Sequence, residues 1–231
     1  MRKKLTAEEK KLAFLELCIR EFHRTRGEEW ANGITHIIGV VFGIVALTMM
    51  MVFSSLNGNV WHVVSCSIFG TTLIILSLMS SLYHLLTNFR AKRVFQIFDH
   101  CTIYFLIAGT YTPFVFCTLG HTKIAWFIFG VEWGLTLVGV LVETLLPEIV
   151  NYVTLPIYLV MGWLIVIDYK VVQNNLSSAG LWTLVAGGLA YTIGVIFYAM
   201  DRVPYMHTIW HVFVLGGMVC HWVCVMFFVI P

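Results

Sequence analysis

The chain has 231 residues, of which 59% are hydrophobic and 11% are charged, and its mean hydropathy is +0.87. Too little polar surface is available to coat a water-soluble globule, so the composition excludes a soluble enzyme and predicts an integral membrane protein. The formal net charge of +2 gives no sign of a nucleic-acid partner, and we expect none.

The first thirty residues are rich in charge and differ from the rest of the chain. Thr6 and Glu9 have the spacing of a capping box. One helical face carries the apolar residues Leu12, Leu15, Ile19 and Phe22. For residues 1–28 this pattern predicts a cytoplasmic segment that forms either a short amphipathic helix on the membrane surface or a solvated tail. We expect no cleaved signal peptide.

Seven apolar runs follow, and each is close to the roughly 20 residues that a helix needs to cross a bilayer. In chain order they cover residues 31–53, 60–86, 95–118, 123–144, 150–168, 179–200 and 206–230. The runs are continuous, whereas the strands of a membrane β-barrel alternate between apolar and polar residues. We therefore predict an all-α fold, with a seven-helix transmembrane domain over residues 29–231.

The basic residues predict how this bundle is oriented, because Lys and Arg near span ends are retained in the cytoplasm. With the N-terminus inside, all of the 14 Lys and Arg residues except Lys123 and Lys170 lie on the cytoplasmic side. We therefore expect a cytoplasmic N-terminus and a C-terminus on the outside.

Polar residues within the spans gather at the predicted cytoplasmic level. They are Glu29, Asn32 and His36 on the first span, Ser80 and His84 on the second, Asp99 and His100 on the third, and His207 and His211 on the seventh. A charged group inside a bilayer costs about 2.5–3.5 kcal/mol on insertion scales. Polar groups that share one depth therefore indicate a functional site.

His207 and His211 lie four residues apart, which places both imidazoles on one helical face. With His84 they make three imidazoles, and three imidazoles with a fourth position left to water are the ligand set of a catalytic zinc ion. The HxxxH spacing alone also fits two hydrogen-bonded polar side chains. The residue after His207 is threonine, so the sequence is not an HExxH zinc protease.

The neighbouring polar residues suggest supporting roles. Asp99 could act as a general base, and Ser80, one turn before His84, could steady the His84 ring. Glu29, Asn32 and His36 share a helical face and either orient the ligands or bind water at the helix entry.

Five further residues have simpler interpretations. We expect His100 to form an interhelical hydrogen bond, because it follows Asp99 and points about 100° away from it. His62, His121 and His221 are expected to be structural or solvated. Glu132, within the fourth span, needs a partner or a proton and indicates a polar cavity.

Three motifs carry a family resemblance: "SSLYH" closes the second span, "FDHCTIYFLIAGTYTPF" opens the third, and "HTIWH" opens the seventh. Together with "EEWANGITHIIGVVFG" they resemble the haemolysin III branch of the progestin and adipoQ receptor family. The resemblance implies seven helices and a zinc ion near the cytoplasmic face, held by His84, His207 and His211. It also implies that Asp99 and Ser80 belong to the same cluster.

The resemblance extends to expectations about function. Adiponectin-receptor members of this family are linked to ceramide hydrolysis, and bacterial members to membrane-lipid homeostasis and, by name, to haemolysis. The chain lacks the long N-terminal domain of the adiponectin receptors, so no protein hormone is implied as a partner.

Three functions are compatible with these observations. The leading hypothesis is a zinc-dependent hydrolase in the plasma membrane of a bacterium, acting on an amide or ester bond of a ceramide-like lipid or a phospholipid. The alternative is a non-catalytic, zinc-stabilised receptor or lipid sensor. The third is a pore-forming haemolysin.

Overall fold

The computed structural model describes residues 24–120 and 122–231, in which helices joined by short loops and turns are the only regular secondary structure. Seven of its helical segments are long and apolar enough to cross a membrane. The all-α, seven-helix prediction is therefore confirmed. The amphipathic helix predicted near the N-terminus and His121 lie outside the described residues.

The spans begin and end at identifiable residues. They are α2 (Arg26–Asn57), α3 (Val60–Leu85), α4 (Phe89–Pro113) continued by the wide helical turn η1 (Phe114–Thr118), α5 (Lys123–Leu145), the segment Tyr152–Asn175, α8 (Ser178–Ala199), and α9 (Met206–Cys224) continued by η3 (Val225–Val229).

The fifth span is broken, whereas the sequence predicted one continuous helix over residues 150–168. It consists of α6 (Val150–Gly162), the tight turn η2 (Leu164–Asp168) and α7 (Tyr169–Asn175). Tyr111 of α4 accounts for the break: its hydroxyl donates to the carbonyl of Gly162 at 3.0 Å and accepts from the N–H of Ile165 at 2.9 Å. These two bonds satisfy backbone groups that a break inside the membrane would otherwise leave unpaired.

Local capping explains where α2 and α9 begin. Thr25 and Glu28 form a capping box at the start of α2, in which the Thr25 hydroxyl accepts from the N–H of Glu28 and the Glu28 carboxylate accepts from the N–H of Thr25. The other oxygen of Glu28 accepts from the N–H of Tyr205 at 2.9 Å. Tyr205 has a φ of 62°, the left-handed conformation, and immediately precedes α9. Glu28 therefore ties the start of α2 to the loop between α8 and α9.

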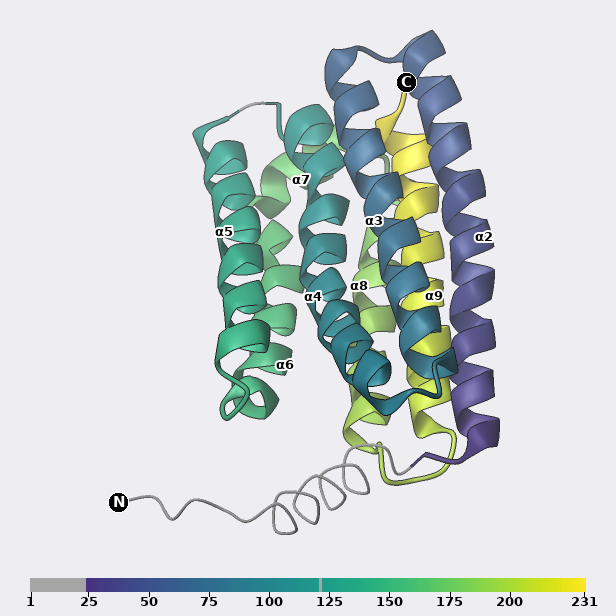
Figure 1. Cartoon of the computed structure of the whole chain (residues 1–231). Helices are drawn as coiled ribbons and strands as arrows, with labels where there is room; N and C mark the ends of the chain where they lie inside the picture. The colour runs from purple at the N-terminus through teal and green to yellow at the C-terminus, as the bar shows by residue number, and fades with distance from the viewer. Residues whose placement is uncertain (1–23, 121) are drawn as a thin grey trace, which may run out of the picture.

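The helices pack in a ring (Figure 1). Around it, α5 contacts α4, α4 contacts α3, α3 contacts α2, α2 contacts α9, and α9 contacts α8, while α6 and α7 lie between α8 and α5. Phe69, Leu73, Phe114 and Met50 are fully or almost fully buried in its core. Large apolar side chains such as Leu56, Phe127 and Leu137 point outward, as expected where helices face lipid.

Candidate metal centre

Three histidines meet at the end of the bundle where α2 begins, which is the lower end in Figure 1. His84 lies in the last turn of α3, and His207 and His211 lie in the first turns of α9. One ring nitrogen from each lies within 4.8 Å of the others. The ring centroid of His211 is 4.9 Å from that of His84 and 4.6 Å from that of His207. The structure thus brings together the three residues that the sequence suggested as ligands.

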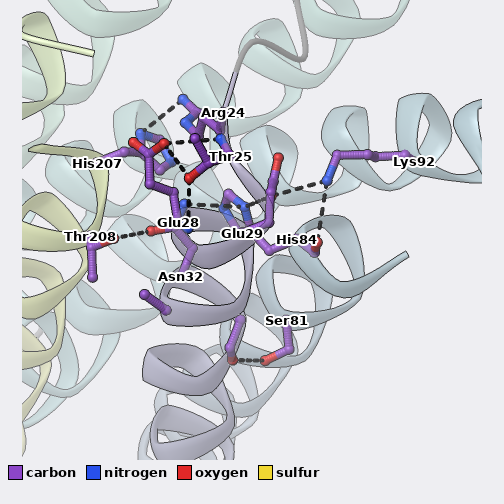
Figure 2. A network of polar contacts seen from close by, with 12 residues as sticks. Arg24, Thr25, Glu28, Glu29, Asn32, Ser81, His84, Lys92, His207 and Thr208 are labelled. Carbon is purple, nitrogen blue, oxygen red and sulfur yellow. Dashed lines mark hydrogen bonds and ion pairs between the residues drawn. The ribbon is translucent and has the colours of Figure 1, made fainter. Parts of the chain in front are cut away.

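A carboxylate holds the outer nitrogen of His84 (Figure 2). Glu29 of α2 accepts from Nδ1 of His84 at 2.7 Å, and the same carboxylate oxygen lies 3.0 Å from Nζ of Lys92. The amide nitrogen of Asn32 lies 3.4 Å from the same ring nitrogen. These contacts fix the orientation of the His84 ring and direct Nε2 away from Glu29.

The other two supporting residues expected on α2 also reach the cluster. The side-chain oxygen of Asn32 accepts from the hydroxyl of Thr208 at 2.5 Å, which links α2 to α9 beside His207. The ring of His36 packs edge-on against His211, with a centroid distance of 4.3 Å. Glu29, Asn32 and His36 therefore all contact the histidine cluster or a residue next to it.

Two charged residues that the sequence analysis did not assign to the site, Arg24 and Asp201, contact His207. Nδ1 of His207 lies 3.5 Å from Oδ1 of Asp201 and 3.2 Å from Nη2 of Arg24, and Arg24 also pairs with Asp201. Burial by itself would lower the pKa of the Arg24 guanidinium, but neighbouring Tyr83 and Asp201 offset this effect and the pKa is raised. Arg24 is therefore a permanent positive charge beside the cluster.

The donor set fits a metal ion of the zinc type. Nε2 of His84 and Nδ1 of His211 are buried and have no hydrogen-bond partner in the described part of the chain. Leaving a buried polar atom unpaired costs about 1–3 kcal/mol, and a metal ion between the rings would remove this cost. The hydrogen bond from Nδ1 of His84 to the carboxylate of Glu29 is one that metal-binding histidines usually make.

Asp99 and Ser80 line a cavity of about 680 Å³ that begins at this cluster and is also lined by His207 and His211. Asp99 lies on α4 and Ser80 on α3, and both are buried. Nδ1 of His84 contacts Glu29 and Asn32, while Lys92 pairs with the same Glu29 oxygen and donates to the carbonyl of His84. The role of Ser80 in steadying the His84 ring stays a prediction.

The remaining histidines agree with their simpler interpretations. His100 of α4 lies 3.3 Å from Glu143 of α5, which is the interhelical contact expected for it. His62 takes part in the N-terminal cap of α3, and His221 lies 3.3 Å from the carbonyl of Leu184.

Glu132 lies away from the cavity at the histidine cluster. It is fully buried, its carboxylate oxygens have no hydrogen-bond partner among the described residues, and it does not line that cavity. The prediction that Glu132 needs a partner or a proton therefore leaves the proton, and the polar cavity expected around it is not the one at the cluster.

The fold and the cluster together define an integral multi-pass helical membrane protein with a three-histidine cluster that could hold a metal ion. The family model described as "Haemolysin-III related" matches residues 24–222. The chain belongs to the haemolysin III family, which confirms the family resemblance drawn from the four motifs.

Individual relatives agree with this assignment. The chain is 41% identical over 201 residues to "Hemolysin-3 homolog" of Bacillus subtilis (strain 168), covering 87% of this chain and 94% of that protein. It is 37% identical over 204 residues to "Hemolysin-3" of Bacillus cereus, covering 88% and 93%. The human protein "Monocyte to macrophage differentiation factor" is 30% identical over 204 residues, covering 84% and 82%. The bacterial relatives support the plasma membrane of a bacterium as the location of the chain.

Proposed function

We propose that this protein is a zinc-dependent hydrolase that cleaves an amide or ester bond of a membrane lipid at the cytoplasmic side of the bilayer. The observation that carries the proposal is the meeting of three histidines, two of them buried, from α3 and α9, beside a large cavity that a buried aspartate also lines. A structural zinc site would require a fourth protein ligand, whereas three ligands leave a position open.

Each residue has a role in the proposed reaction. His84, His207 and His211 would hold the metal ion, and Glu29 and Asp201 would keep two of these rings in orientation. A zinc ion, when bound, supplies Lewis-acid chemistry that activates water and polarises a carbonyl group. Asp99 would take the proton that water loses and return it to the leaving nitrogen or oxygen. Ser80 would hydrogen-bond a polar group of the substrate.

The cavity suits a lipid substrate. Beyond the polar end its lining includes apolar residues of α4 and α9 such as Ile103, Ile107 and Val214. An acyl chain could lie there with its carbonyl group at the histidine cluster. A ceramide-like lipid and a phospholipid are both acceptable substrates on these grounds.

The test incubates the purified protein with ceramide-like lipids and phospholipids and measures the released fatty acid by mass spectrometry. We expect release by the wild type and a loss of about 10²- to 10⁴-fold in Asp99→Asn, because general base catalysis is worth about that much. Zinc content should be unchanged in this variant. Asp168→Asn is the matched control, since Asp168 is a buried carboxylate that does not line the cavity.

The non-catalytic sensor has one observation in its favour. Glu29 and Asn32 of α2 contact His84 of α3 and Thr208 of α9, so an ion at the cluster would lock three helices together. If the wild type binds zinc at the site but cleaves no lipid, the sensor is favoured over the hydrolase. A pore would instead show ion conductance in liposomes that survives zinc removal.

A further inference from the structure

Lys92 is buried beside the histidine cluster, although it lies near a helix end, where a lysine could reach water. It is the fourth residue of α4, and its side chain is only 10% exposed. A lysine near the end of a membrane helix usually extends to the interface and keeps its ammonium group in water. The first turn of a helix also disfavours a positive charge, because that end of the helix dipole is positive. Neither solvation nor the helix itself therefore explains why Lys92 is buried.

The ammonium group of Lys92 acts on His84 in two ways. Nζ lies 3.0 Å from Oε2 of Glu29, the oxygen that accepts from Nδ1 of His84. Nζ also donates to the backbone carbonyl of His84 at 3.2 Å, and Figure 2 shows both contacts. The ring centroid of Tyr83 lies 5.0 Å from Nζ, a distance at which an aromatic ring attracts a cation. Lys92 therefore holds both the backbone of His84 and the carboxylate that orients its ring.

The pair with Lys92 keeps the carboxylate of Glu29 at His84. The side chain of Glu29 is 15% exposed, so water competes for its carboxylate. The attraction between opposite charges is several times stronger in a partly buried setting than in bulk water, and the ammonium group therefore opposes rotation of the carboxylate away from His84. Such a rotation would leave Nδ1 of His84 beside the amide nitrogen of Asn32, 3.4 Å away. That nitrogen is a donor, so it would favour the tautomer with the proton on Nε2, the nitrogen that must bind the metal ion.

Lys92 also joins the cluster to the helix that carries Asp99. That helix, α4, supplies none of the three histidines, but it carries the proposed general base. Asp99 follows Lys92 by seven residues, which places the two buried side chains on one face of α4, about 10 Å apart along the helix axis. The contact of Lys92 with His84 therefore helps to set the position of Asp99 relative to a metal ligand.

We propose that Lys92 is a positioning residue of the metal centre, which holds Glu29 against His84 and anchors α4 to that ligand. The inference rests on the zinc site of the proposed function and not on lipid hydrolysis. Lys92 does not line the cavity, so it acts through Glu29 and His84 and not on a substrate. Its effect on zinc binding should therefore depend on the presence of Glu29.

The experiment is a double-mutant cycle on zinc affinity, measured for the full chain in detergent by competition with a chromophoric chelator. Lys92→Met, which keeps the apolar stem and removes the ammonium group, should weaken zinc binding by about 10- to 100-fold, the usual effect of losing a supporting contact. In a Glu29→Gln background the same change should alter the affinity by less than about threefold, because residues that act through one contact are not additive. Lys92→Arg keeps the charge and should retain part of the affinity. Lys123→Met is the control, since Lys123 is an exposed lysine at the start of α5.

Hydrogen exchange over the first turns of α4 tests the anchor separately. Zinc should slow amide exchange over residues 89–96 in the wild type, and this effect should be lost in Lys92→Met. Without zinc, exchange over α5 should be the same in both proteins, which shows that the variant is folded. If α5 has lost its protection, both measurements are made on Lys92→Gln, which removes the charge and retains an N–H donor.

Three results would overturn the proposal. Zinc affinity in Lys92→Met equal to that of the wild type would show that Lys92 has no part in metal binding. Tighter binding in this variant would show that the ammonium group acts only by repelling the ion. An equal loss of affinity with and without Glu29 would assign Lys92 to a structural role that does not act through that carboxylate.

Failure of this inference and failure of the proposed hydrolase are distinguishable, because zinc binding requires no bond to be cleaved. Zinc affinity that depends on Lys92 through Glu29, in a protein that cleaves no lipid, would keep the inference and reject the hydrolase. Lipid cleavage by a protein whose zinc affinity is indifferent to Lys92 would do the opposite.

Discussion

The carboxylate of Glu29 lies 2.7 Å from Nδ1 of His84, so a residue of the first span orients a ring of the second. His84 is 2% exposed and its Nε2 has no hydrogen-bond partner among the described residues. Glu29 therefore leaves Nε2 as the nitrogen that can bind a metal ion.

This contact predicts that Glu29→Gln weakens metal binding without abolishing it. Loss of such a supporting carboxylate usually reduces metal affinity by about 10- to 100-fold. The measurement is competition for zinc against a chromophoric chelator. Glu148→Gln is the control, because Glu148 is exposed and is not a member of the cluster, and it should leave the affinity unchanged. An affinity in Glu29→Gln equal to that of the wild type would show that Glu29 has no part in metal binding.

The broken fifth span predicts that Tyr111→Phe destabilises the protein. The substitution removes the hydroxyl that pairs the carbonyl of Gly162 and the N–H of Ile165, and a buried unpaired group costs about 1–3 kcal/mol. The melting temperature in detergent should therefore fall by several degrees. Tyr152→Phe provides the comparison, since Tyr152 is 78% exposed and should tolerate the change. Equal melting temperatures for the two variants would refute this explanation of the break.

The contact between α2 and α3 predicts that Gly70→Ala is also destabilising. A Cβ at Gly70 would lie 2.8 Å from Cβ and 3.0 Å from Cα of Leu47, so the backbones would have to separate. Overpacking of this kind costs about 1–3 kcal/mol. At Gly130 a Cβ meets nothing within 4 Å, so Gly130→Ala should be neutral or slightly stabilising. If both alanine variants had the same melting temperature as the wild type, the close approach of α2 and α3 at Gly70 would be contradicted.

The sequence predicted the number and approximate position of the spans because membrane helices are marked by long apolar runs. It placed the start of the first span at residue 31, whereas α2 begins at Arg26, because the first turns are capped and charged and so carry no hydropathy signal. The break after Gly162 was missed for a different reason. It depends on the hydroxyl of Tyr111, a residue of another helix.

The histidine cluster could be anticipated because its members share one depth in the bilayer and two of them have helical spacing. Arg24 and Lys92 could not be anticipated. Both were counted as basic residues that orient the bundle, and nothing in the sequence shows that Arg24 contacts His207 or that Lys92 pairs with Glu29. These contacts join segments far apart in the chain, so they follow from the packing of the helices and not from any local pattern.

The most direct test of the account is the metal content of the purified wild type beside His84→Ala, His207→Ala and His211→Ala. His62→Ala serves as the control, because His62 caps α3 and lies outside the cluster. We expect about one zinc ion per chain in the wild type and in His62→Ala, and little in each of the other three variants, because three ligands are needed to hold the ion. A wild type that contains no metal, or cluster variants that retain it in full, would contradict the account.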